Sequence, residues 1–224
     1  MRVGVIGDTH EPFCKDGYAE WCRYIFDCWE IEYVIHAGDL LDYHGASFHD
    51  SEPQLKDAYN EHLDAKEALQ KWYELFPQLT LVEGNHDIIP NRLLKKIGLD
   101  PQTFLKEMGD IYDFPPDWEV CESLIMDNVL YHHGHTATGV NGFLKDAKDR
   151  MMNTVTGHVH SNAGIAAFAC EDRLVWGMAV GSGVDQKHLS MAYGKHFRAK
   201  PIVSCGVVID GHPYIEYMDL GRKK

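Results

Sequence analysis

Several features that would place the chain in a specialised class are missing from its sequence. No apolar run reaches the roughly 20 residues that a membrane-spanning helix needs, so we expect no membrane partner. There is also no internal repeat, no low-complexity tract and no linker rich in proline or serine. The 224 residues are therefore expected to form a single domain, residues 1–224.

Cysteine is sparse and scattered. The chain has 6 cysteines, with no CxxC pair and no dense framework that would suggest a disulfide-stapled protein. The first ten residues, MRVGVIGDTH, lack a charged region followed by a long apolar stretch and a cleavage site. We therefore expect a cytoplasmic protein whose cysteines are reduced and mostly fill the core.

Positive charge is in short supply, since 21 lysines and arginines face 34 acidic residues and the net charge is -13. This balance disfavours extended nucleic acid as a partner without excluding it. Only RLLKK at 92–96 approaches a basic cluster, and a solvated helix face is the commoner outcome for such a run. The 14 histidines are more informative, because histidine is the commonest metal ligand.

The first half of the chain alternates between strand and helix patterns. Apolar runs at 2–8, 33–39 and 79–87 end in glycine followed by acidic, amide or imidazole groups, and helical spacing covers 17–29 and about 52–75. This alternation predicts right-handed βαβ units with a largely parallel sheet. Ligands of such sheets gather at the carboxyl ends of the strands.

The second half is rich in strand patterns, with only 139–150 helical in character. We expect these strands to form a second sheet packed on the first, which gives an α/β fold of two mixed sheets in a sandwich flanked by helices. The Asp210–Gly211 pair between apolar runs predicts a hairpin. The strand-like runs are 118–126, 128–134, 154–158, 163–170, 174–180, 202–210 and 214–219.

Five short polar clusters stand out, each next to glycine, which lets the backbone approach a ligand closely. Taken singly, each is unremarkable, because Gly-Asp is usually a turn and a lone histidine is usually a satisfied polar residue. The clusters are GDTH with Asp8 and His10, GD with Asp39, GNHD with Asn85 and His86, HGH with His133 and His135, and GHVH with His158 and His160.

Taken in order, the five clusters resemble the calcineurin-like metallophosphoesterases, a family of dinuclear metal phosphoesterases. The resemblance spans residues 8–160 and implies a four-layer αββα fold and a hydrolase, a phosphatase or phosphodiesterase. It also implies that two metal ions share a hydroxide that attacks phosphorus. Its predicted ligands are Asp8, His10 and His160 for one ion, Asn85, His133 and His158 for the other, and Asp39 as the bridge.

Carboxylate, amide and imidazole donors without thiolate suit Mn²⁺ first, with Fe, Zn²⁺ or Mg²⁺ also acceptable. The resemblance further implies that His86 protonates the leaving oxygen or stabilises the transition state. Asp42 would orient His86, although an ordinary carboxylate at a helix start is the alternative.

Three residues are candidates for substrate contact: Arg92, His44 and His135. His132 is expected to face away from His133 on its strand, and His36 to be packed in the sheet. Asp87 is either a supporting group of the site or a cap. The long insertion at 43–80 would shape access to the substrate.

The stretch GDLLDYHG lacks the arginine that protein serine/threonine phosphatases of this superfamily carry after the second aspartate, which argues against that activity. Two other interpretations stay open. One is a nuclease or nucleotide phosphodiesterase, and the other is a catalytically idle metal-binding module for protein interaction. The substrate, the preference for monoester or diester and the oligomeric state are left open by the sequence.

Overall fold

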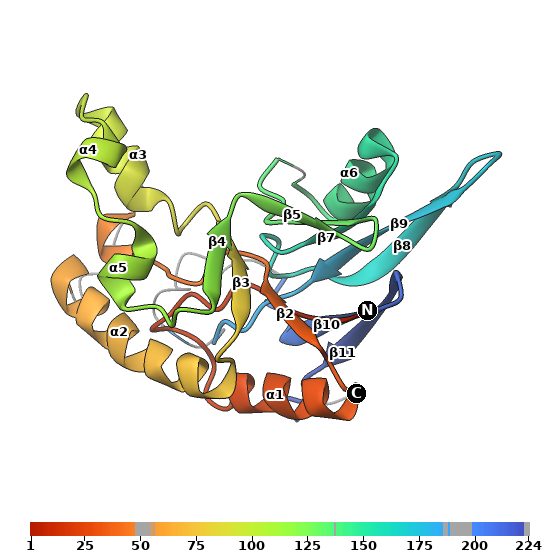
Figure 1. The fold of residues 1–224 in the computed structure, drawn as a ribbon, viewed down its shortest axis with the longest axis horizontal. Helices are drawn as coiled ribbons and strands as arrows, with labels where there is room; N and C mark the ends of the chain where they lie inside the picture. Colours follow the sequence, from red (N-terminus) through yellow and green to blue (C-terminus); the bar gives the residue numbers. More distant parts are fainter. Residues whose placement is uncertain (48–54, 56, 137, 186–187, 189–198, 222–224) are drawn as a thin grey trace.

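A computed structural model describes residues 1–47, 55, 57–136, 138–185, 188 and 199–221. Its larger sheet has six strands in the order β11-β10-β1-β2-β3-β4 (Figure 1). β1 to β4 run parallel, and β10 and β11 extend the sheet in antiparallel pairing from the free side of β1. These strands are β1 (Arg2–Ile6), β2 (Tyr33–His36), β3 (Leu79–Val82), β4 (Trp118–Cys121), β10 (Ser204–Ile209) and β11 (His212–Tyr217).

The smaller sheet has five strands in the order β5-β6-β7-β9-β8, with β6, β7 and β9 parallel and the two edge strands antiparallel. It packs on the larger sheet through a core that includes Val5, Val155 and Met178, all 0% exposed. The predicted sandwich of two mixed sheets is therefore confirmed. Its strands are β5 (Ser123–Met126), β6 (Val129–His132), β7 (Asn153–Thr156), β8 (Ala163–Ala169) and β9 (Leu174–Val180).

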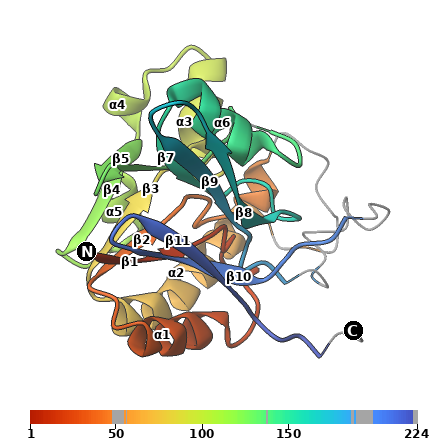
Figure 2. The same ribbon diagram turned by 90° about the vertical axis from the view of Figure 1, so that its right-hand side faces the viewer.

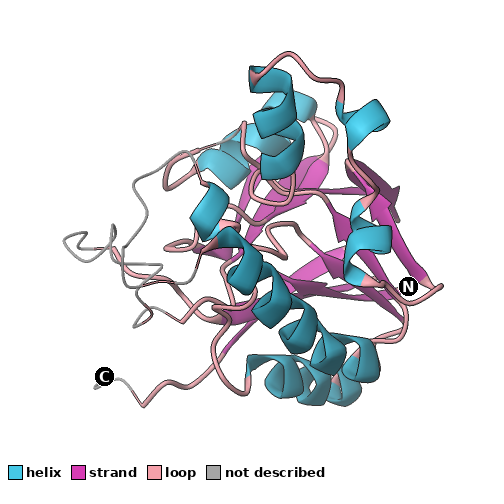
Figure 3. Cartoon of the chain, turned by 90° about the vertical axis from the view of Figure 1, so that its left-hand side faces the viewer, coloured by secondary structure: helices cyan, strands magenta, loops and turns pink. Residues whose placement is uncertain are grey.

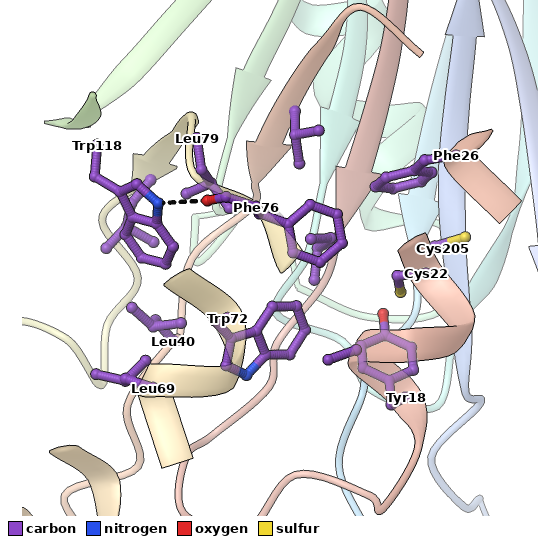
Figure 4. Packing of buried hydrophobic residues seen from close by; sticks show 14 of the residues in the cluster. Tyr18, Cys22, Phe26, Leu40, Leu69, Trp72, Phe76, Leu79, Trp118 and Cys205 are labelled. Atoms are coloured by element: carbon purple, nitrogen blue, oxygen red, sulfur yellow. Dashed lines mark hydrogen bonds between the residues drawn. The ribbon is translucent and has the colours of Figure 1, made fainter. Parts of the chain in front are cut away.

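Helices cover the outer faces of both sheets, which gives the four expected layers (Figure 2). Helices α1 (Tyr18–Cys28) and α2 (Ala58–Leu75) cover the larger sheet with a second core, and α6 (Gly142–Arg150) covers the smaller one. Figure 4 shows Trp72 of α2 beside Phe76, and the Trp118 indole N–H donating to the Phe76 carbonyl at 2.7 Å.

The connection from β3 to β4 contains α3 (Ile89–Lys96), α4 (Pro101–Phe104) and α5 (Met108–Tyr112), and a 3-10 turn, η1 (His44–Ala46), follows β2. Figure 3 shows the molecule from the side on which α2 to α5 lie. α2 begins at Ala58 because the Asp57 side chain accepts the amides of Tyr59 and Asn60. Residues 52–54 and 56 of the predicted helix lie outside the described residues.

The assignment of all strand-like runs after residue 115 to the second sheet was wrong for three of them. The run 118–126 is two strands separated at Glu122, where the chain passes from the larger sheet to the smaller one. The runs 202–210 and 214–219 return to the larger sheet, since β10 supplies the hydrogen-bond partner that β1 otherwise lacks on that side. The hairpin at Asp210–Gly211 is confirmed, and both residues have positive φ, 47° and 78°.

None of the helices within the described ranges is long and apolar enough to cross a membrane.

Candidate metal centre

The five polar clusters meet because each follows a strand that runs in the same direction as its neighbours. β1, β2 and β3 are parallel in one sheet, and β6 and β7 are parallel in the other, so their carboxyl ends bring the following loops together. The residues that follow these strands are Asp8 and His10 after β1, Asp39 and Asp42 after β2, Asn85 and His86 after β3, His133 after β6, and His158 and His160 after β7.

Glycine is required where these loops touch. A Cβ on Gly38, whose φ is 97°, would lie 2.6 Å from His133 Nδ1, and one on Gly84 would lie 2.1 Å from Asp39 Oδ1. Three predicted donors are themselves held at positive φ: His10 at 51°, Asp39 at 53° and His158 at 69°. Such backbone strain in non-glycine residues is concentrated at functional sites.

The first group of donors surrounds Asp8. His10 Nε2 lies 3.0 Å from His160 Nε2, and His160 Nε2 lies 3.4 Å from Asp8 Oδ2. His10 Nε2 is also 3.6 Å from Asp39 Oδ2. The three residues predicted to hold one ion therefore lie together, and Asp39 is next to them.

The second group is centred on His133. Its Nε2 atom lies 2.9 Å from Asn85 Oδ1, 3.3 Å from His158 Nδ1 and 3.2 Å from Asp39 Oδ2. Asp39 Oδ2 thus reaches both groups. Asp39 also belongs to two sets of three residues whose donor atoms lie within 4.8 Å of one another. One set contains Asp39, His10 and His86, and the other contains Asp39, His133 and His158.

Asp8 provides the test of whether these residues suit a metal ion. It is 0% exposed, and neither of its carboxylate oxygens has a hydrogen-bond partner in the part of the chain that the structure describes. Burial, with the nearby Asp39, raises the pKa of Asp8 to about 7, while the charges of His133 and His10 oppose the rise. A buried carboxylate without partners is costly, and a cation between the two groups would satisfy it.

The tautomer of His133 agrees with this interpretation. Its Nδ1 lies 2.9 Å from the Ala37 carbonyl oxygen, which only accepts, so Nδ1 carries a proton and Nε2 is the nitrogen turned toward the cluster, where a metal ion would replace its proton. Burial acts to lower the pKa of His133, but Asp39 and Asp8 raise it to about 10. The two carboxylates therefore favour a positive charge at this place. Oxygen and nitrogen donors without thiolate suit Mn²⁺, Fe, Zn²⁺ or Mg²⁺.

His86 lies at the edge of the cluster, with 23% of its side chain exposed. Its Nδ1 is 2.6 Å from the main-chain carbonyl oxygen of Asp42, and its amide donates to Asp39 Oδ1 at 2.8 Å. The Asp42 carboxylate instead meets His10, with Oδ1 only 2.6 Å from His10 Nδ1 and 3.5 Å from His86 Nδ1. Asp42 thus contacts His86 through its main chain and the predicted ligand His10 through its side chain.

The three candidate substrate residues lie in different surroundings. His44 is buried, and its Nδ1 is 3.9 Å from Asp42 Oδ2. His135 is exposed, with its ring centre 6.2 Å from that of His133. Arg92 is an exposed residue of α3. Their roles remain predictions, and most of the stretch 188–201 lies outside the described residues.

Several supporting contacts become visible only in the structure. Asp87 accepts the amides of Leu41 and Gly84 at 3.0 and 2.8 Å, so it ties the loops after β2 and β3 together. Side-chain identity gives no sign of such main-chain partners. The expectations for two other histidines are confirmed: His132 turns away to Asp146 at 2.8 Å, and His36 is 0% exposed in the sheet.

The family model described as calcineurin-like phosphoesterase matches residues 1–180. None of the curated proteins compared with the chain matches it.

Similar solved structures include Vps29 of Chaetomium thermophilum, with 12% identity, a TM-score of 0.50 and coverage of 99% of this chain and 93% of that one. An archaeal phosphodiesterase has 16% identity, a TM-score of 0.49 and coverage of 97% and 100%. YfcE, a phosphoesterase from E. coli, has 14% identity, a TM-score of 0.47 and coverage of 93% and 88%. At these identities the likeness concerns the fold.

Proposed function

The chain belongs to the calcineurin-like phosphoesterase family, and on that premise we propose that it hydrolyses a phosphoester bond with the aid of two divalent metal ions. The observation that carries the proposal is Asp8, whose fully buried carboxylate has two oxygens without a hydrogen-bond partner among the described residues. His160 Nε2 and His133 Nδ1 lie 3.4 and 3.7 Å from its oxygens, and His10 Nε2 lies 3.0 Å from His160 Nε2. A buried carboxylate without hydrogen-bond partners, among imidazole and carboxylate groups that can bind metal, fits a cation site.

In this proposal Asp8, His10 and His160 would hold one ion, Asn85, His133 and His158 would hold the other, and Asp39 would serve both. Mn²⁺ is our first choice, and Fe, Zn²⁺ and Mg²⁺ suit the same donors. When bound, such ions lower the pKa of water and polarise phosphoryl oxygens.

The chain fixes the orientation of its own donors. The Asp39 carboxylate is held through Oδ1 by the His86 amide, which leaves Oδ2 facing both groups. His10 is held at Nδ1 by the Asp42 carboxylate, and His133 at Nδ1 by the Ala37 carbonyl, so each turns Nε2 to the cluster. Anchored ligands of this kind raise metal affinity because less freedom is lost on binding.

His86 is assigned to the leaving oxygen. Its Nδ1 is committed to the Asp42 carbonyl, so Nε2 is the atom that faces the substrate. Burial and the charge of His10 lower the pKa of His86, while Asp39 and Asp42 oppose this. A lowered pKa makes the protonated ring a better proton donor to a leaving oxygen.

The test is the hydrolysis of a bis-aryl phosphodiester, and of the aryl monoester beside it, by chelator-stripped protein before and after Mn²⁺ is restored. We expect turnover only with metal, and the ratio of the two rates assigns the preference for diester or monoester. The same samples are analysed for bound metal. Two bound ions per chain with neither ester hydrolysed, nor any nucleotide diester, would contradict the proposal and favour an idle module for protein interaction.

A further inference from the structure

A pocket borders the segment after β3, which also carries Asn85 and His86. It has a volume of about 750 Å³ and is enclosed by the segment after β3, by α4 and α5 and by the beginning of β4. Glu83 and Asp87 of the loop after β3, and Pro90 and Asn91 of α3, are among its lining residues. Its other walls include Tyr43, which follows Asp42 directly in the sequence.

The lining of this pocket is acidic. Glu83, Asp87, Glu107 and Asp110 contribute four carboxylates, against the single ammonium of Lys106. The Asp87 oxygens are already taken by two main-chain amides. Glu83 is half-buried and has no ion-pair partner in the described part of the chain. The pocket therefore repels anions and leaves a carboxylate available to a cation.

The same pocket presents aromatic rings. Phe114 and Trp118 both line it, and their ring centres are 5.0 Å apart at 57°. The indole of Trp118 is 7% exposed, donates its N–H to the Phe76 carbonyl and packs on Tyr73 and Phe114, so its main part here is to hold the Phe114 ring in place. Tyr43 adds a third ring. Aromatic rings that share a pocket with a carboxylate lacking an ion-pair partner are the combination that recognises organic ammonium groups.

We propose that this pocket binds a small organic cation with an apolar body, of the quaternary ammonium class. Glu83 would offset its charge, and Phe114 and Tyr43 would cover its methyl groups, with Trp118 packed against Phe114. The ligand would lie against the back of the loop of Asn85 and His86, separate from the donor cluster. The proposal concerns binding alone and does not depend on the proposed hydrolysis.

The experiment is a calorimetric titration of the full chain with choline, alongside 3,3-dimethyl-1-butanol, which has the same shape without the charge. We expect saturable choline binding, with the neutral analogue at least about tenfold weaker. Glu83→Gln and Phe114→Leu should each weaken choline binding by about tenfold. Glu67→Gln, which removes an exposed carboxylate of α2, is the matched control and should bind choline as the parent chain does.

Three results would overturn the proposal. One is the absence of saturable choline binding, and another is equal affinity for the neutral analogue, which would leave an apolar hollow without charge recognition. The third is unchanged binding in both pocket variants, provided that their circular dichroism matches that of the parent chain. Chelator-stripped protein should bind choline as well as metal-loaded protein does, because the pocket does not use the metal donors.

Discussion

Asp42 offers a sharp test of how the site is organised, because its two contacts are made by different parts of the residue. Its carboxylate lies 2.6 Å from His10 Nδ1, and its main-chain carbonyl lies 2.6 Å from His86 Nδ1. Asp42→Asn removes the charge next to His10 and leaves the carbonyl in place. We therefore expect this change to weaken metal binding without removing the proposed acid.

The expected magnitude follows from the role of such partners. A group that orients a ligating histidine typically contributes 10- to 100-fold to metal affinity, or about 1.4–2.8 kcal/mol. The affinity that falls should be that for the ion at Asp8, His10 and His160. The ion held by Asn85, His133 and His158 should bind nearly as before, since Asp42 contacts none of these three in the described structure. Turnover at saturating metal should stay within about threefold of the parent rate, because His86 keeps its anchor.

The assay is competition with a chromophoric chelator, which resolves the two affinities, followed by turnover across a range of Mn²⁺ concentrations. Asp146→Asn is the matched control, because it changes a second buried carboxylate–histidine pair, 2.8 Å apart, whose histidine is not a predicted donor. Parent-like affinity at both sites would show that the carboxylate does not support His10. Loss of turnover that saturating metal does not restore would place Asp42 in the chemistry through its side chain.

Three further changes probe other parts of the molecule. His86→Ala should cut turnover by roughly 10²- to 10⁴-fold with metal content nearly unchanged, and a parent-like rate would remove it from the mechanism. Asp39→Ala should lower the affinity for both metal ions by more than about tenfold. A variant that keeps two fully occupied metal sites would show that Asp39 does not bridge them. Trp72→Phe removes the indole donor to Glu11, a bond of 2.6 Å to a carboxyl group whose pKa burial raises to about 7. The free energy of unfolding by urea should fall by about 1–3 kcal/mol, more at pH 8.5 than at pH 5.5, because ionised Glu11 needs the donor most; equal losses at both pH values would contradict this reasoning.

The edge of the sheet where the donors gather was predictable, because apolar runs that end in Gly-Asp or Gly-Asn mark the carboxyl ends of buried strands. Asp8, Asp39 and Asn85 all follow such runs. The division of residues 118–126 between two sheets was not predictable, since the run is strand-like throughout. Its break at Glu122 depends on whether β3 or β6 is the available partner, and that is decided by pairing across distant parts of the chain.

The anchors of the donors were hidden for a different reason. His133 is fixed by the Ala37 carbonyl and His86 by the Asp42 carbonyl, and every residue carries such a carbonyl. The sequence therefore allows the ligating side chain to be predicted, but not the main-chain carbonyl that orients it.

Strain in the backbone carries complementary information. His10, Asp39 and His158 occupy the left-handed region, where a residue other than glycine costs about 1–3 kcal/mol. Glycine would relieve that cost at all three positions, and the neighbouring loops already use it at Gly38 and Gly134. A chain under pressure for stability alone would be expected to place glycine or asparagine there. Seven other non-glycine residues, among them Glu30 and Met151, also have positive φ, so the strain alone does not mark the site. What marks it is that three predicted metal donors occupy strained positions in loops that converge at one place.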